Sequence, residues 1–216
     1  MSKFIEKFTT HYLSLITLEL CKYLKLSFTL ATGGIFFSLT QILMPLVGLY
    51  KNKQLNFAIY IVRTLSRIFL LGFSPLILFY HLPTFCGNAY LANKSTITKV
   101  AIPLLCMIMF VTHPIGNQAF MYSMYWLIPI AIALYKPESI FLQALGSTFT
   151  VHSVGSVIWL YTKQIDPAIW HVLLPVVIIE RLVFASLTTI AFYSVKSIEN
   201  LSIPKNQVPE IAEMVK

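Results

Sequence analysis

The chain has 216 residues, of which 57% are hydrophobic and 11% are charged, and its formal net charge is +8. So few polar side chains cannot cover a water-soluble globule of this size, which excludes an ordinary soluble domain. The lysines lie between apolar segments instead of forming a stripe with interleaved aromatics, so the positive charge favours membrane topology over nucleic-acid binding.

The first 25 residues mix lysines and glutamates with apolar residues, a pattern that predicts an interfacial amphipathic segment and no cleavable signal peptide. From residue 26, apolar runs long enough for ~30 Å of hydrocarbon predict an all-α fold, a polytopic bundle of about six transmembrane helices over 26–196. A five-span alternative places 51–67 on the membrane surface. We expect 197–216 to be a polar cytoplasmic tail. The six runs are 26–49, 55–80, 97–113, 118–135, 139–161 and 169–194.

Basic residues collect in the loops on one side of the predicted spans, which places both termini in the cytoplasm of a multi-pass cell-membrane protein. The other side carries only Lys51, Lys53 and Lys163. The richer side carries Lys3, Lys7, Lys22, Lys25, Lys94, Lys99, Lys136, Lys196, Lys205 and Lys216.

Small side chains recur at helical spacing along the first predicted span, at Ser27, Ala31, Gly34 and Ser38. Such a ridge lets another helix approach closely. It predicts either a packing face within the bundle or a docking surface for a partner membrane protein.

The second span carries Asn56, Tyr60, Arg63 and Arg67 on one helical face. Two arginines are costly in contact with lipid, so this face predicts a cavity lining for an anionic or carbonyl-bearing ligand. The alternative is a surface helix whose arginines reach the headgroups.

A polar turn separates the third and fourth spans. His113, Asn117 and Gln118 offer donors and acceptors there, and Tyr122 and Tyr125 continue the helical spacing of Gln118. We expect His113, Asn117, Gln118 and Tyr122 to bind ligand, whereas Tyr125 and Trp126 fit an interfacial aromatic belt.

The fifth and last spans carry ionisable groups at membrane depth. His152 shares a stripe with Thr148 and Ser156, and it predicts either a ligand contact or a structural hydrogen bond. Glu180 and Arg181 lie midway along the last run, where a charge costs at least ~2.5 kcal/mol. They predict a ligand site, the alternative being that Glu180 neutralises Arg63 or Arg67 across helices.

The segment FLQALGSTFTVHSVGSVIW (141–159) and the later stretch from Pro175 to Leu182 resemble segments of the substrate-binding S components of energy-coupling-factor vitamin transporters. The resemblance implies six spans, capture of a vitamin or precursor from outside, and docking through the first helix onto a transmembrane coupling subunit driven by an ATPase pair. Ser27 and Ala31 stand where that helix usually has an alanine pair.

These patterns predict a non-enzymatic uptake protein that captures a small organic solute in one outward-facing cavity, with no cofactor, metal or nucleic acid. An assembly or scaffold subunit is the main alternative. An intramembrane metal-dependent enzyme is less favoured, because the chain has no HExxH motif and no nucleophile elbow.

Overall fold

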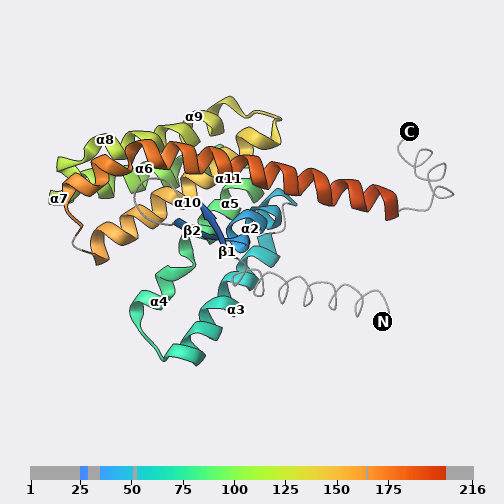
Figure 1. The fold of residues 1–216 in the computed structure, drawn as a ribbon, viewed down its shortest axis with the longest axis horizontal. Coiled ribbons are helices and arrows are strands. Elements are labelled where there is room, and N and C mark those ends of the chain that lie inside the picture. Colours follow the sequence, from blue (N-terminus) through green and yellow to red (C-terminus); the bar gives the residue numbers. More distant parts are fainter. Residues whose placement is uncertain (1–24, 29–34, 51–52, 164, 203–216) are drawn as a thin grey trace.

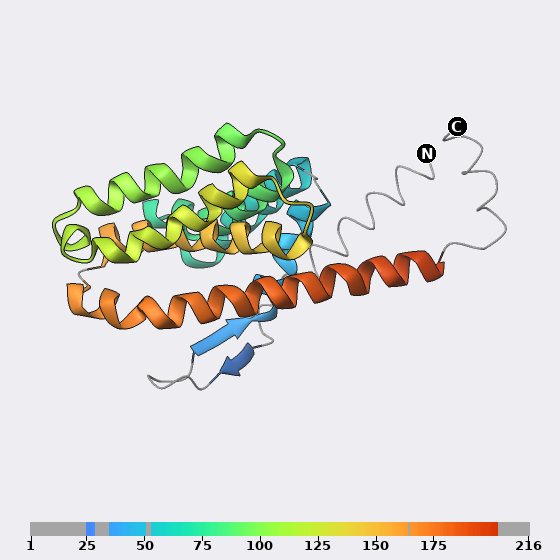
Figure 2. The same ribbon diagram turned by 90° about the horizontal axis from the view of Figure 1, so that it is seen from above.

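The computed structural model describes residues 25–28, 35–50, 53–163 and 165–202. Most of these residues are helical, which confirms the all-α class in its coarse form. The helices form an elongated bundle, and the long helix α11 lies along its length (Figures 1 and 2). Residues 1–24 of the expected amphipathic segment and 203–216 of the expected tail lie outside the described residues.

The first predicted span is wrong, because residues 26–49 do not form one helix. Strands β1 (Lys25–Phe28) and β2 (Ile35–Ser38) pair antiparallel, with Lys25 opposite Ser38, and helix α2 (Leu39–Leu49) follows. Ser27 and Ser38 therefore lie on two strands and cannot share a helical ridge, and Ala31 and Gly34 lie outside the described residues. The β-branched and aromatic residues at 35–37 favour a strand here.

The second predicted span is divided. Helix α3 (Lys53–Leu71) ends at Gly72, whose positive φ of 78° glycine adopts without strain, and α4 (Pro75–Tyr80) begins at a proline. The two helices form an arm, residues 53–80, that projects from the bundle (Figure 1). Helix α5 (Leu82–Ala92), which the sequence analysis did not separate from its neighbours, lies inside the bundle against α10 and α2.

The third, fourth and fifth predicted spans are confirmed as helical segments. They correspond to α6 (Thr96–Thr112), to the series α8 (Phe120–Ser123), η1 (Met124–Trp126) and α9 (Leu127–Tyr135), and to α10 (Ile140–Thr162). The short helix α7 (Pro114–Gln118) occupies the predicted polar turn. The last helix, α11 (Pro167–Ser202), is longer than predicted.

Membrane-length helices are fewer than the sequence predicted. Within the described part of the chain, Pro167–Ile198 of α11 is the one helix that is both long and apolar enough to cross a bilayer. Thr96–Thr112 and Phe120–Tyr135 are apolar but shorter. The structure therefore shows a helical bundle, and the bundle of six spans remains a prediction.

Helix α10 lies at the centre of the core and packs against α5, α6, α9 and α11. Its small side chains allow close approach: the Ser147 hydroxyl donates a 2.8 Å hydrogen bond to the Gly87 carbonyl of α5. Large buried side chains such as Phe110, Trp126 and Phe149 fill the space around it. This packing fixes the side chains of α10 relative to those of α8 and α11.

Candidate functional site

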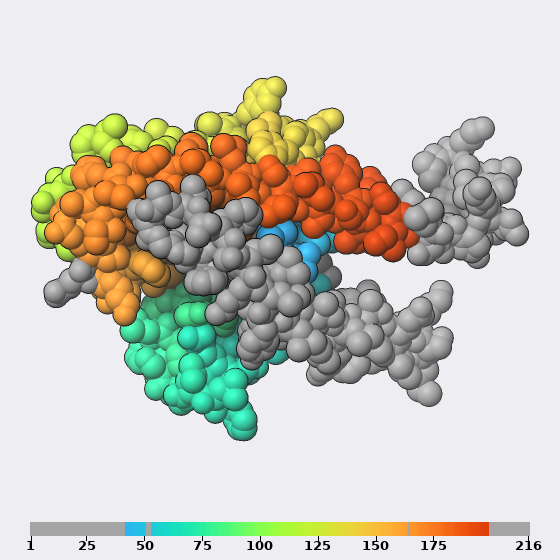
Figure 3. All heavy atoms as spheres, in the orientation of Figure 1, coloured from blue at the N-terminus to red at the C-terminus, as the bar shows by residue number. Residues whose placement is uncertain are grey.

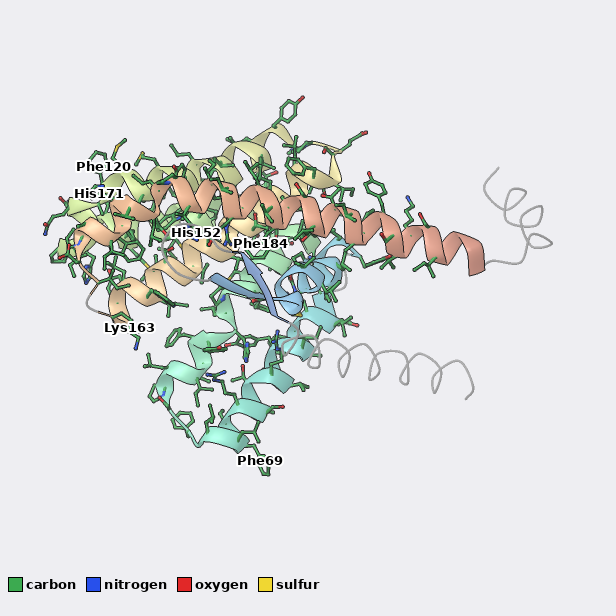
Figure 4. The ribbon with its side chains drawn as sticks, viewed as in Figure 1. Phe69, Phe120, His152, Lys163, His171 and Phe184 are labelled. Atoms are coloured by element: carbon green, nitrogen blue, oxygen red, sulfur yellow. The ribbon has the colours of Figure 1, made fainter. Side chains whose placement is uncertain are left out.

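Polar side chains from three helices meet where α8, α10 and α11 come together. The rings of Tyr122 and His152 lie 5.3 Å apart between centroids, and Ser156 Oγ lies 3.5 Å from His152 Nε2. The Tyr122 phenol lies near the Ser156 hydroxyl and within electrostatic range of Arg181 and Glu180. Figure 4 labels His152 on α10 and Phe184 on α11.

Glu180 and Arg181 form an ion pair with each other, with Arg181 Nη2 3.0 Å from Glu180 Oε2. Only 11% and 14% of the Arg181 and Glu180 side chains are exposed. The guanidinium also lies 4.8 Å above the ring of Phe184, a cation–π distance. The alternative in which Glu180 neutralises Arg63 or Arg67 is therefore wrong.

Four aromatic rings pack beside the polar groups. Tyr122 lies 4.8 Å from Trp170 and 6.4 Å from Trp126, measured between ring centroids. Phe110 contacts all three of these rings at 5.1 to 5.7 Å. We call the whole set the core cluster: Phe110, Tyr122, Trp126, His152, Ser156, Trp170, Glu180 and Arg181.

Helical spacing explains how each helix contributes to the core cluster. His152 and Ser156 are four residues apart on α10, and Trp170 and Arg181 are eleven apart on α11, so each pair occupies one face of its helix. Val177 and Ala185, which lie four residues before and four residues after Arg181 on the same face of α11, are also buried. The periodicity of α11 thus turns its ionisable residue Arg181 toward α10.

Three N–H groups of the core cluster are buried with no hydrogen-bond partner among the described residues: Trp126 Nε1, Trp170 Nε1 and Arg181 Nε. The tryptophan side chains are 0% and 2% exposed. Buried polar groups are nearly always paired, so three unmatched donors in one cluster are unusual. They mark a place where hydrogen-bond acceptors would be stabilised.

Three predicted site residues lie at the end of the bundle and stabilise the α6–α7 turn. His113 Nδ1 accepts a 3.3 Å hydrogen bond from the Ile115 amide, and its ring packs against Tyr161. The side-chain amides of Asn117 and Gln118 donate to the carbonyls of Val111 and Pro114. The predicted ligand contacts of His113, Asn117 and Gln118 therefore correspond here to turn-forming bonds.

Arg63 belongs to a different region. It lines a small hollow between α2, α3 and α5, together with Asn56, Tyr60 and His81. Arg67 lies farther along the arm, 3.4 Å from the centroid of the Tyr80 ring. The structure places Arg63 apart from the core cluster, because α3 packs mainly on α2, α4 and α5.

The structure thus brings together four of the eight predicted binding residues, Tyr122, His152, Glu180 and Arg181. The two tryptophans of the cluster were not among the binding residues predicted from the sequence. Trp126 is buried, so its assignment to an interfacial belt is wrong, and the neighbouring Tyr125 donates a 3.1 Å hydrogen bond to the Leu174 carbonyl of α11. Trp170 could have been predicted from the sequence, because its helical spacing from Arg181 places both residues on one face of α11.

The groups of the core cluster that could take part in chemistry are a histidine, a serine, a tyrosine and an ion pair. The hydroxyl–imidazole pair, Ser156 and His152, has a long 3.5 Å separation. In the part of the chain that the structure describes, no three His, Cys, Asp or Glu side chains are grouped to hold a metal ion.

Comparisons of the chain with protein-family models, with curated proteins and with solved structures found no match.

Proposed function

We propose that the chain is an integral membrane protein that binds a small organic solute at the core cluster and passes it into the cell. The observation that carries this proposal is the convergence of Tyr122, His152 and the Glu180–Arg181 pair between three helices, next to buried N–H groups without partners. A charged pair and unmatched donors inside an apolar bundle lower the stability of the fold. Such groups are common where a ligand binds.

The surface of the bundle supports a membrane location. Large hydrophobic side chains point outward on nearly every helix, among them Phe69 at 89% exposure and Ile97 at 80%. Phe69 lies at the tip of the projecting arm and Phe120 at the end of the bundle (Figure 4), so the exposed residues are spread over the molecule. Soluble monomers rarely expose apolar surface on this scale.

The interior also contains small polar side chains. Asn88, Ser147, Thr150, Ser153 and Thr188 are completely buried, and all five use their hydroxyl or amide group in a hydrogen bond within the bundle. Small polar residues at helix contacts and large apolar residues outside are typical of helices packed in lipid. This distribution favours a bilayer as the surrounding solvent.

We further propose that uptake depends on partner subunits, as the resemblance to energy-coupling-factor S components implies. The resembling segment 141–159 forms most of α10 and includes His152. The docking surface of that family does not carry over residue by residue, because Ser27 and Ser38 lie on strands. Copurification of a transmembrane subunit and an ATPase pair would support this part of the proposal.

The test is ligand binding by the detergent-solubilised full-length protein. We expect at least one compound in a panel of vitamins and their precursors to raise the melting temperature, since a ligand at 100 times its Kd adds about 2.7 kcal/mol. Mass spectrometry of gently purified protein should identify a copurifying solute. If no compound shifts the melting temperature and no small molecule copurifies, the proposal is wrong.

Two variants connect binding to the core cluster. Tyr122→Phe removes one hydroxyl from the cluster, and we expect it to weaken the thermal shift. Tyr193→Phe is the matched control, because Tyr193 is an exposed tyrosine on the same protein. Equal shifts for the two variants would place the binding site elsewhere.

A further inference from the structure

The unmatched groups of the core cluster are all donors. Trp126 Nε1, Trp170 Nε1 and Arg181 Nε can donate hydrogen bonds and cannot accept them. The other polar groups already have partners: Ser156 lies against His152, and Glu180 accepts from Arg181. A ligand that completes this set must therefore bring acceptor atoms, such as carbonyl oxygens or unprotonated ring nitrogens.

The charge of the cluster is already balanced. The carboxylate of Glu180 and the guanidinium of Arg181 are 3.0 Å apart and mostly buried. A bound carboxylate or phosphate would add a negative charge that no further cation of the core cluster, as the described residues define it, compensates, and uncompensated buried charge is strongly unfavourable. The ion pair therefore favours a ligand without net charge, which agrees with the carbonyl-bearing ligand predicted from the sequence and not with the anionic alternative.

Flat side chains surround these groups. The rings of Phe110, Tyr122, Trp126 and Trp170 contact one another at tilted, edge-on or stacked angles, and the imidazole of His152 adjoins Tyr122. Aromatic rings favour other rings in such offset and edge-on arrangements. Rings with buried N–H groups at their edges suit a planar ligand that carries acceptors on its own edge.

From these three features we propose that the solute is an uncharged, planar heteroaromatic compound bearing carbonyl or ring-nitrogen acceptors. The inference rests on the proposed function, because it specifies the ligand of that same site. It assigns the two indole N–H groups as donors to the ligand and the Glu180–Arg181 pair as the element that selects against anions.

Matched probes test the selection. Nicotinamide and nicotinate share a ring and differ in charge, as do uracil and orotate, and each can be titrated against the detergent-solubilised full-length protein. We expect at least one neutral member to bind at least tenfold more tightly than its carboxylate partner. If the carboxylate of either pair bound more tightly than its neutral partner, the inference would be overturned and the proposed function would remain intact. The same conclusion would follow if only non-aromatic compounds of the vitamin panel bound. Absence of binding by every compound would overturn both.

Indole N–H resonances give a readout that does not depend on variant folding. The chain has three tryptophans, so ¹⁵N labelling yields three indole signals. A bound neutral probe should shift the signals of Trp126 and Trp170 and leave that of Trp159, which is 62% exposed on α10, in place. Trp170→Phe should weaken binding at least fivefold, whereas Trp159→Phe should not. Probe binding with unchanged Trp126 and Trp170 signals would overturn the assignment.

Discussion

At the scale of single residues, the main feature is an ion pair between sequence neighbours. Consecutive residues on a helix point about 100° apart, yet long side chains can bend toward each other, and Arg181 reaches Glu180 in this way. Each charge of the pair therefore has its ionic partner on the same helix. The contribution of this ion pair to the free energy of unfolding can be measured separately from its contribution to ligand binding.

We expect Arg181→Gln to lower the free energy of unfolding by about 3 kcal/mol, because it leaves the buried Glu180 carboxylate uncompensated. The double variant Glu180→Gln/Arg181→Gln should recover most of this loss, since no charge remains. Unfolding of both proteins in detergent, followed by circular dichroism, provides the comparison. A double variant as unstable as the single one would show that charge balance is not the stabilising interaction.

At the scale of elements, close helix contacts hold the site in place. Helix α2 approaches α5 through Gly48, and it approaches α11 through a 3.2 Å hydrogen bond from Thr188 to the Ile42 carbonyl. On the space-filling surface, α11 forms a continuous band across one face of the molecule (Figure 3). The position of Arg181 therefore depends on the packing of α11 against α10, α2 and α8.

Gly48→Ala tests one of these contacts. A Cβ atom at Gly48 would lie 2.7 Å from the Asn88 carbonyl oxygen and 2.8 Å from Leu91 Cβ, so α2 and α5 would have to separate. We expect a loss of about 1–3 kcal/mol in unfolding free energy. The control is Gly155→Ala on α10, where the nearest neighbour is Pro83 at 3.8 Å. That substitution should be neutral or stabilising, because alanine favours helix. Similar losses in both variants would contradict the packing described here.

At the scale of the whole molecule, many large apolar side chains are exposed, and small polar side chains are buried between the helices together with aromatic ones. Helix α11 extends beyond what a bilayer requires: from Pro167 to Ser197 it rises roughly 45 Å, against about 30 Å of hydrocarbon. Both ends of the helix should therefore reach water on opposite sides of the membrane.

Cysteine labelling tests this topology. In a variant with Cys21, Cys86 and Cys106 replaced by alanine, we expect Lys163→Cys to react with a membrane-impermeant maleimide on intact cells. Ser197→Cys should react only after permeabilisation, because the distribution of basic residues places the C-terminus in the cytoplasm. The buried position Ala185 supplies an unreactive control as Ala185→Cys. Labelling of both exposed positions from the same side would contradict a membrane-spanning α11.

The sequence by itself determined the helical class and the positions of the helices between Thr96 and Thr162, because apolar length and proline or glycine boundaries are local properties. It also identified Tyr122, His152 and Arg181, since ionisable or polar groups in apolar runs are conspicuous. It failed at residues 26–38, where a composition that suits a membrane helix also suits paired strands.

Only the tertiary structure decided which of these residues meet. Periodicity shows which face of a helix a side chain occupies, but it does not show which helix covers that face. Arg63 and Arg181 are equally unusual in the sequence, yet the packing of α3 on α2 and α5 separates Arg63 from the core cluster, and the packing of α11 on α10 adds Trp170 to it. Contacts between residues distant in the chain form the site, so it could not be read from local pattern.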